Sequence, residues 1–202
     1  MKVTVIDHGA GNVASVERAL ARIGVASERA VLSAAISSAK VLILPGVGHF
    51  SALVRALDQK SLRVPLLDAL ARGVPFLGIC LGLQALYESS DESPDSQGLG
   101  VLRGTIRLLP AHLKLPHMGW NRIHALGPTR LFRGIPAGSY FYFAHSFAAP
   151  YLPPEAAAAT CTYGSEFVAA IERDNLFAVQ FHPEKSGAAG EQLLRNFVSQ
   201  AL

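Results

Sequence analysis

Gly78-Ile79-Cys80-Leu81-Gly82 is the stretch that decides how this chain folds and which chemistry it can carry. It follows the apolar run 74–79, which predicts a buried strand, and leads into residues 81–88, whose pattern predicts a helix. A strand that turns at once into a helix leaves no room for side chains beside the turn, so glycine two residues before and after the thiol has a steric reason. With serine, the same pattern is G-x-S-x-G, the turn that exposes a nucleophile. Cys80 is therefore the candidate nucleophile.

A second segment, His182-Pro183-Glu184, ends the apolar run 176–181. On an extended chain, residues i and i+2 point to the same side, so we expect the imidazole and the carboxylate to lie together. A nucleophile, a base and a carboxylate that orients the base form a catalytic triad, which is recognised by roles rather than by chain order. Each piece also has a plain structural explanation: a histidine after a strand is often a hydrogen-bonded loop residue, and a free cysteine is usually a small buried hydrophobe, as we expect for Cys161. Their combination in one chain favours catalysis.

The composition limits the possible classes of protein. A chain of 202 residues, half of them hydrophobic, is predicted to form a single domain over residues 1–202 with a full core. The net charge is +3, and the Lys and Arg residues are scattered, which argues against nucleic-acid and membrane binding. No apolar run approaches the roughly 20 residues of a membrane span. Two cysteines cannot make a disulfide framework, so we expect a reducing cytoplasm, and we expect neither a metal nor a cofactor.

The order of the elements predicts an α/β fold with an open, mostly parallel sheet, helices on both faces and an antiparallel extension in the second half. In the first half, apolar strands alternate with helices; the expected strands are 3–6, 41–44 and 74–79, and the expected helices are 12–23, 51–57 and 62–72. A polar loop is expected over 89–98. Short strand-like runs then follow at 101–109, 140–147, 160–163, 167–172 and 177–181, before a last helix over 187–202.

Four of the conspicuous segments follow expected strands. They are Asp7-His8-Gly9, Pro45-Gly46-Val47-Gly48, Cys80 and His182. In open parallel sheets, ligands bind outside the carboxyl ends of the strands. If these strands are parallel neighbours, the four segments lie on one rim of the sheet.

The residues also resemble a known family. Gly-Ile-Cys-Leu-Gly-Leu-Gln at 78–84 and Gln-Phe-His-Pro-Glu at 180–184 look like the triad glutamine amidotransferases. Further segments resemble the glutaminase subunits of imidazole glycerol phosphate synthases: Asp7-x-Gly9-x-Gly11-Asn12, Pro-Gly-Val-Gly at 45–48, Pro-His-Met-Gly-Trp-Asn at 116–121, His145-Ser146 and His-Pro-Glu-Lys-Ser at 182–186. The resemblance runs from the first strand to the last helix. One departure is His8, where tyrosine is more usual.

The resemblance implies a reaction and a partner. Glutamine is hydrolysed to glutamate and ammonia by Cys80, His182 and Glu184. A separate cyclase subunit of (β/α)₈ fold, joined in a heterodimer, receives the ammonia and makes imidazole glycerol phosphate in histidine biosynthesis. Chemically, Cys80 as a thiolate would attack the amide, while His182 would protonate the leaving ammonia and then activate water.

The resemblance and the turn together indicate which groups stabilise the oxyanion and which residues bind glutamine. The Leu81 N–H follows the nucleophile and is the usual first donor, and the family pattern offers the backbone of Val47 and Gly48 as the second. The matching glutamine-binding positions are Gln84, the backbone at Ser146 and Phe147, and Glu92 for the ammonium group.

Three residues lie beside these motifs without being needed by the triad: Asn12, Trp120 and Lys185. We predict that they form the interface with the partner. An exposed tryptophan is a common interface anchor, although a lone tryptophan is otherwise expected in a core.

Three other functions remain open on the residues alone. The triad fits amidotransferases that feed other synthases, such as those for anthranilate, aminodeoxychorismate, pyridoxal phosphate, purines or carbamoyl phosphate; the motif at 116–121 and Lys185-Ser186 favour the histidine pathway. Gly9-Ala10-Gly11-Asn12-Val13-Ala14 fits G-x-G-x-x-A, with Glu28 near the ribose-binding offset, but a nucleotide-binding module leaves Cys80 unexplained. A cysteine peptidase or deglycase also places a cysteine at a similar turn, but a His-Pro-Glu strand end is not the usual arrangement in those proteins.

Overall fold

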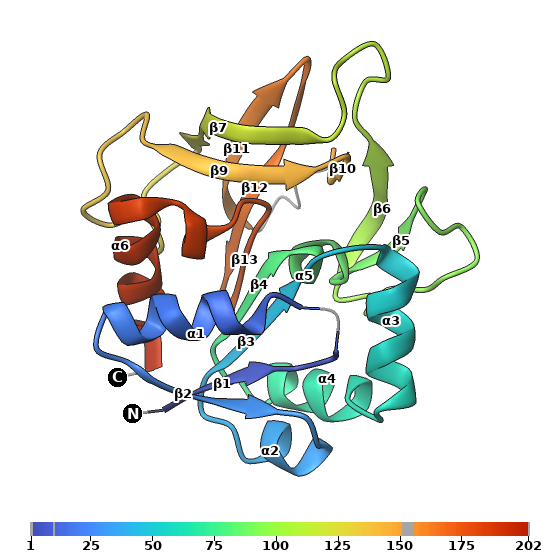
Figure 1. Ribbon diagram of the computed structural model, residues 1–202, viewed down its shortest axis with the longest axis vertical. Coiled ribbons are helices and arrows are strands. Elements are labelled where there is room, and N and C mark those ends of the chain that lie inside the picture. Colours follow the sequence, from blue (N-terminus) through green and yellow to red (C-terminus); the bar gives the residue numbers. More distant parts are fainter. Residues whose placement is uncertain (1, 10, 151–155, 202) are drawn as a thin grey trace.

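The structure is a computed structural model that describes residues 2–9, 11–150 and 156–201. An eight-stranded sheet runs through the molecule, with neighbouring strands in the order β2-β1-β3-β4-β13-β12-β11-β8 (Figure 1). The parallel strands are β2 (Ala26–Ala30), β1 (Lys2–Ile6), β3 (Leu42–Gly46), β4 (Phe76–Cys80) and β13 (Leu176–Val179). The antiparallel strands are β12 (Ser165–Arg173), β11 (Ala157–Tyr163) and β8 (His124–Ala125). This confirms the expected α/β fold with an antiparallel extension.

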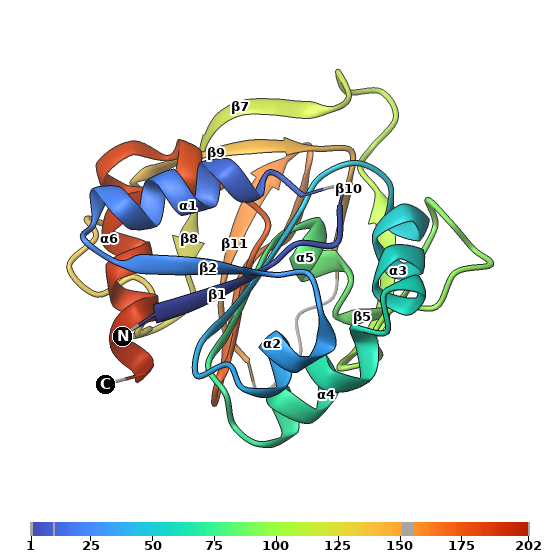
Figure 2. The same cartoon turned by 60° about the horizontal axis from the view of Figure 1, so that its bottom comes forward.

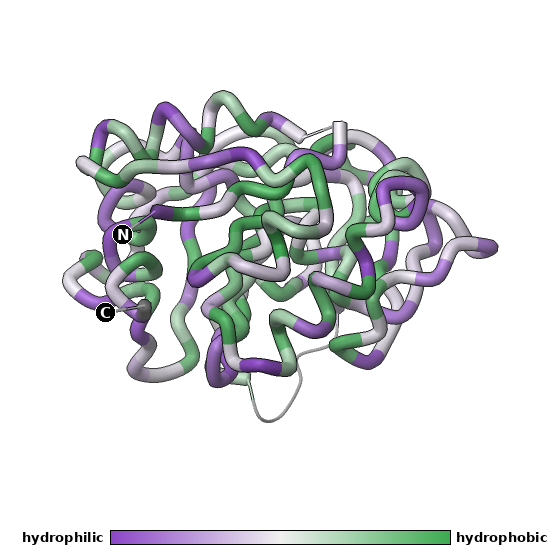
Figure 3. Tube along the Cα trace, turned by 90° about the horizontal axis from the view of Figure 1, so that it is seen from below, coloured by the Kyte–Doolittle hydropathy of each residue, from purple (hydrophilic) through white to green (hydrophobic). Residues whose placement is uncertain are grey.

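Helices cover both faces of the parallel part of the sheet (Figures 1 and 2). One face carries α1 (Val13–Arg22) and α6 (Gly187–Val198), and the other carries α2 (Ser33–Ser37), α3 (Phe50–Gln59) and α4 (Arg63–Ala71). The short helix α5 (Leu81–Gln84) follows β4 directly. Figure 3 shows that hydrophobic stretches concentrate toward the middle of the molecule, whereas the outer loops are more polar.

The apolar runs of the sequence follow from this two-sided cover. Along β3, Leu42 and Leu44 belong to the core beneath α3 and α4, while Ile43 between them belongs to the core beneath α1 and α6. Because successive side chains of a strand point to opposite faces, a strand covered on both faces needs apolar residues at every position.

One expected helix is wrong over its second half. The helix predicted over 81–88 ends at Gln84, and the chain continues as strand β5 (Tyr87–Ser90), which also takes the start of the loop expected over 89–98. Strand β5 pairs with β6 (Leu102–Leu108), and Tyr87 is completely buried there. Burial of a large aromatic side chain against a strand that lies later in the chain outweighs local helix preference.

Other elements were not predicted at all. Strand β2 was missed because, with the sequence ASERA, it is a half-exposed edge strand without an apolar run. Helix α2, of only five residues, was missed as well. Strand β7 (His117–Arg122) was also missed; it pairs with β9 (Tyr140–His145) above the main sheet in Figure 1. The run expected over 140–147 divides into β9 and β10 (Phe147–Ala148), and β10 joins β6 in a separate three-stranded sheet.

The last helix is shorter than expected over 187–202. Helix α6 ends at Val198, and a 3₁₀ turn, η2 (Ser199–Ala201), follows. Leu202, and Ala10 of the glycine-rich segment, lie outside the described residues.

Candidate active site

Cys80 stands at a strained turn between β4 and α5. Its backbone has φ 55° and ψ −107°, a left-handed conformation that residues other than glycine seldom adopt. A side chain on Gly78 would place its Cβ 2.7 Å from the Gly82 carbonyl oxygen, and one on Gly82 would collide with the Leu44 carbonyl. Both glycines are therefore required by close backbone approach, as the sequence predicts. Strain of this kind persists where surrounding structure enforces it, and it is common at functional sites.

His182 reaches Cys80 through the pairing of β13 with β4. The parallel register sets Val179 opposite Ile79, so the chain that leaves β13 passes beside the turn at Cys80. The backbone N–H of His182 donates to the Tyr142 carbonyl at 2.8 Å, and this hydrogen bond links His182 to β9. Glu184 lies in the 3₁₀ turn η1 (Pro183–Lys185), and its Oε1 is 2.9 Å from Nδ1 of His182. Both side chains are almost fully buried.

The electrostatics of the site favour a charged imidazole. Burial lowers the pKa of His182, but Cys80 and the Glu184 carboxylate raise it by charge and by hydrogen bonding, and their effect wins, so that the pKa rises to about 10. His182 is therefore an imidazolium at neutral pH, and its Nδ1 donates to Glu184. The second oxygen of Glu184 has no hydrogen-bond partner among the described residues. An imidazolium beside a thiol is the arrangement that supports a thiolate and can protonate a leaving group.

A cavity of about 300 Å³ opens at this end of the sheet. Its lining includes Cys80, His182 and Lys185. It also includes every residue predicted to stabilise the oxyanion or to bind glutamine, namely Val47, Gly48, Leu81, Gln84, Glu92, Ser146 and Phe147. Pro116, Ala144 and His145 complete it. The strands therefore bring the predicted residues to one rim. Among the described residues, no group of three His, Cys, Asp or Glu side chains is arranged to hold a metal ion.

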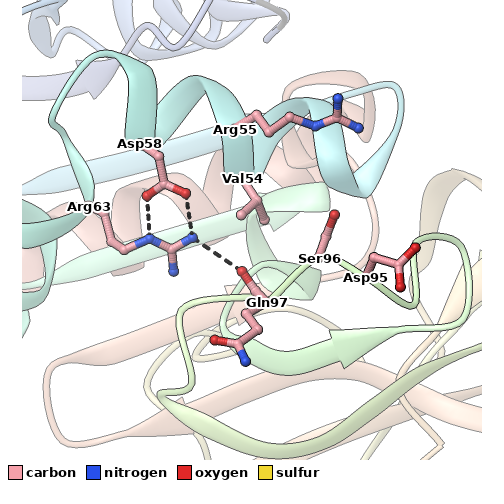
Figure 4. A pocket seen from close by; sticks show the side chains of 7 residues that line it. All are labelled: Val54, Arg55, Asp58, Arg63, Asp95, Ser96 and Gln97. Carbon is pink, nitrogen blue, oxygen red and sulfur yellow. Dashed lines mark hydrogen bonds and ion pairs between the residues drawn. The ribbon is translucent and has the colours of Figure 1, made fainter.

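A wider hollow of about 670 Å³ lies elsewhere, between α3 and the loop 95–97 (Figure 4). Its lining contains neither cysteine nor histidine. The Arg63 guanidinium there is held by the Asp58 carboxylate and by the Gln97 and Gly98 carbonyls. The smaller cavity at Cys80 is thus the one equipped for nucleophilic chemistry.

Two side-chain amides connect the cavity wall to the sulfur. The Gln84 Nε2 donates to the Phe147 carbonyl at 2.7 Å and to the Gln180 Oε1 at 3.0 Å. The Gln180 Nε2 in turn lies 3.5 Å from the Cys80 sulfur. Gln180 had no predicted role, although it precedes His182 by the i, i+2 spacing that placed Glu184. Because both described contacts of Gln84 use its amide nitrogen, its oxygen is the atom that can face a substrate.

One carboxylate oxygen of Glu92 is already hydrogen-bonded within the protein. Its Oε2 accepts a hydrogen bond of 2.7 Å from the Phe50 N–H at the start of α3, and it lines the cavity. A carboxylate held in this way favours a positive charge nearby.

Of the residues predicted for a partner interface, Lys185 lines the cavity, whereas Trp120 and Asn12 lie outside its lining. Trp120 on β7 is 55% exposed, so the alternative expectation of a core tryptophan is wrong. Its ring meets Tyr142 edge-on at 6.1 Å, and the Lys185 ammonium lies 5.5 Å from the centre of the same Tyr142 ring. Asn12 precedes α1 and is half-buried.

Replacing Glu184 with glutamine should shift the pH dependence of the reaction. The carboxylate helps to raise the pKa of His182, so its loss lowers that pKa from about 10 toward the ordinary value. If protonated His182 supplies the proton to the leaving group, the alkaline limb of kcat should move to lower pH, with a larger loss at pH 9 than at pH 7. The measurement is kcat from pH 6 to 10. Glu191→Gln, which removes only a surface pair with Arg22, is the matched control; an unmoved alkaline limb in Glu184→Gln would contradict the assignment.

A parallel sheet with a cysteine at a strained strand-to-helix turn, and a histidine–carboxylate pair at the neighbouring strand end, is the arrangement typical of enzymes that use a cysteine nucleophile. The chain belongs to the glutamine amidotransferase class-I family, whose model matches residues 4–201.

Curated relatives of high similarity share a single description. The chain is 46% identical over 195 residues to the imidazole glycerol phosphate synthase subunit HisH of Moorella thermoacetica, covering 96% of this chain and 93% of that protein. It is 44% identical over 199 residues to the subunit of the same name in Rhodopirellula baltica, covering 98% and 97%.

Solved structures agree on the fold. A crystal structure described as a glutamine amidotransferase has a TM-score of 0.79 at 18% identity, and the structure of PurLQS from Thermotoga maritima has 0.78 at 19%; each comparison covers 98% of both chains. No helix in the described part of the chain is long and apolar enough to span a membrane.

Proposed function

We propose that this protein is the glutaminase subunit of an imidazole glycerol phosphate synthase. As a single domain, it hydrolyses glutamine to glutamate and ammonia and supplies the ammonia to a cyclase subunit in histidine biosynthesis. The observation that carries the proposal is the His182–Glu184 pair of 2.9 Å at the end of the strand beside Cys80. Two unpaired thiols suit a reducing cytoplasm.

The reaction follows from the positions of these groups. The Cys80 thiolate attacks the side-chain amide carbon of glutamine, and the carbonyl electrons move onto oxygen. His182 gives its proton to the amide nitrogen, which leaves as ammonia, and a thioester remains. Neutral His182 then takes a proton from water, the resulting hydroxide attacks the thioester, and the departure of the thiolate releases glutamate. The imidazolium is thereby restored, so no cofactor is required.

The tetrahedral oxyanion needs donors that are already in place. We assign this role to the Leu81 N–H and to the backbone of Val47 and Gly48, which line the same cavity. Loss of one such donor typically costs ~3 kcal/mol of barrier, roughly 10²–10³ in rate.

Glutamine is held by the wall that Gln84 and Phe147 share. We assign the Gln84 oxygen and the backbone at Ser146 and Phe147 to the amino-acid part of the substrate, and Glu92 to its ammonium group. The 2.7 Å bond from Gln84 to the Phe147 carbonyl supports this assignment because it braces the wall from inside.

The partner is proposed to be a cyclase of (β/α)₈ fold that forms a heterodimer with this chain. Its docking surface comprises Asn12, Trp120 and Lys185, together with Met118, which is 65% exposed on the same strand as Trp120. Large apolar side chains that are exposed next to one another, as Met118 and Trp120 are, are typical of a surface that a partner covers. A covered mouth also keeps ammonia out of water, where it would be protonated and lost.

The partner is identified by an activation experiment. Purified chain is assayed for glutaminase alone, with the cyclase subunit and its ligand, and with synthase subunits for anthranilate, aminodeoxychorismate or purines. We expect weak activity alone and strong stimulation only by the cyclase. Stimulation by another synthase instead would replace the proposed pathway while leaving glutamine hydrolysis in place.

Lys185→Ala and Trp120→Ala should impair stimulation by the cyclase. Lys185 directly follows Glu184, so a partner carboxylate that binds Lys185 can act on the strand end that holds the triad. Coupling energies between sites are typically about 1–3 kcal/mol, or 5–150-fold, and we expect losses in that range. The measurements are the cyclase affinity and the stimulation factor.

The controls for this prediction are Lys40→Ala and Leu32→Ala. Both residues are exposed; Lys40 lies before β3, at the opposite end of that strand from the site, and Leu32 lies beside α2. Equal effects of the control and interface variants would contradict the assigned docking surface.

A further inference from the structure

Two histidines that the triad does not use lie side by side on β7 and β9, with their rings edge-on to each other. His117 on β7 is paired in register with His145 at the end of β9, and both are buried. The His117 Nδ1 is 3.2 Å from the His145 Nε2. His145 also lines the cavity at Cys80.

The neighbours of this pair determine where its protons are. The His145 Nδ1 is 2.9 Å from the Phe147 carbonyl, which only accepts, so that nitrogen carries the hydrogen. In a neutral ring the Nε2 of His145 is then an acceptor, and the His117 Nδ1 must donate to it. The His117 Nε2 is left as an acceptor, and the Asn121 amide nitrogen, which only donates, lies 3.3 Å from it.

Neutral rings fit the surroundings. Burial lowers the pKa of His117 to about 4. For His145, burial lowers the pKa to about 3, against the opposing effect of its bond to Phe147, and the charges of His117 and His182 act in the same direction as burial. Three hydrogen bonds therefore run one way, from Asn121 through His117 and His145 to the Phe147 carbonyl.

That carbonyl is also the end of the second chain of hydrogen bonds. It accepts from Gln84, which contacts Gln180, whose amide reaches the Cys80 sulfur. The two chains meet on one oxygen atom in the wall assigned to glutamine. The position of the Phe147 peptide thus depends on both.

We propose that His117 and His145 are positioning residues, a neutral hydrogen-bond relay that sets the glutamine-binding wall and connects it with the strand on which the partner docks. The inference rests on the proposed glutaminase function. Strand β7 contributes both to the relay and to the docking surface: His117 and Asn121 belong to the relay, while Met118 and Trp120 between them are exposed. Displacement of β7 by a docked partner moves the first two members of the relay and, through them, the Phe147 carbonyl.

A packing role is the alternative that the test must separate. The His117 ring stacks on Tyr163 at 4.1 Å and on Phe143 at 5.0 Å, and the His145 ring meets Phe167 edge-on at 5.0 Å. If the histidines only filled space, phenylalanine would replace them better than asparagine. If they form the relay, the order is reversed at His145, because the asparagine amide nitrogen can take the place of Nδ1 and donate to Phe147.

The experiment compares His145→Phe with His145→Asn in the complex with the cyclase. For His145→Phe we expect the KM for glutamine to rise roughly 10- to 100-fold, because the Phe147 carbonyl keeps Gln84 but loses its second donor and the His117 N–H loses its buried acceptor, with a smaller change in kcat. His145→Asn should recover most of that loss. His117→Phe, which keeps the stacking and removes the relay, should lower the stimulation factor more than the activity of the free chain. A His145→Phe enzyme that equals wild type, or surpasses His145→Asn, would overturn the proposal.

A second measurement does not depend on the variants or on glutamine hydrolysis. In ¹⁵N-histidine-labelled wild-type protein at pH 7, both rings should be neutral and protonated on Nδ1, whereas His182 should be an imidazolium. Nε2-protonated or charged rings at His117 or His145 would refute the relay even if glutaminase activity is confirmed. Correct tautomers in a protein that hydrolyses no glutamine with any partner would instead mean that the proposed function has failed.

Discussion

Cys80→Ala should abolish glutamine hydrolysis, with a fall in kcat of roughly 10⁴-fold or more, the range seen when the nucleophile of a triad is removed. No other group at the turn can form the thioester. Alanine removes only the sulfur atom, which contacts His182, the Gln180 amide and the Ala144 carbonyl, so the fold should remain intact. The measurement is glutamate production by the complex, with the melting temperature as a check on folding.

Two controls make this result specific. The cyclase in the Cys80→Ala complex should still turn over when free ammonia is supplied, because only the source of ammonia has been removed. Cys161→Ala should keep glutaminase activity, since burial raises the pKa of Cys161 to about 12 and leaves it an unreactive thiol in the core. A Cys80→Ala variant that retains wild-type glutaminase activity would refute the nucleophile assignment.

His182→Ala should approach the same loss. His182 keeps the thiolate paired, protonates the leaving ammonia and activates the water, and no other described side chain of the cavity is placed to do all three. His145, the other histidine there, is held neutral by burial, which lowers its pKa to about 3. In His182→Ala, alkylation of Cys80 by a glutamine-like electrophile at neutral pH should also become slow.

The matched control is His124→Ala, which removes an exposed histidine on β8. It should leave both hydrolysis and labelling at wild-type levels. If Cys80 were labelled at an undiminished rate in His182→Ala, His182 would not be the group that activates the thiol.

Local sterics explain why the chemistry could be predicted from sequence. Gly78 is imposed by the Gly82 backbone within the same turn, and Gly82 by the Leu44 carbonyl of the neighbouring strand. His182 and Glu184 lie together as their i, i+2 spacing predicts, although Glu184 is in the 3₁₀ turn η1. The alternation of two-sided apolar strands with helices predicts a parallel sheet, and such a sheet brings strand ends to one rim. Apart from the contact of Gly82 with Leu44, these conclusions need only short-range geometry, which the sequence contains.

The remaining features depend on which segments pair across the chain. Tyr87 lies in a strand rather than a helix because β6 is its neighbour, and β2 forms at the edge of the sheet because β1 hydrogen-bonds to it. Gln180 contacts the Cys80 sulfur only because β13 lies beside β4.

The histidine relay shows the division between sequence and tertiary structure within one motif. The sequence marks residues 116–121 and His145 as family-like segments and by itself determines the strand-like character of 140–147. Only the antiparallel register of β7 with β9 sets His117 opposite His145, and only burial, which lowers the pKa of both rings, makes them neutral donors and acceptors. Register and burial are properties of the packed chain, because they arise from residues far apart in sequence that exclude water from one another.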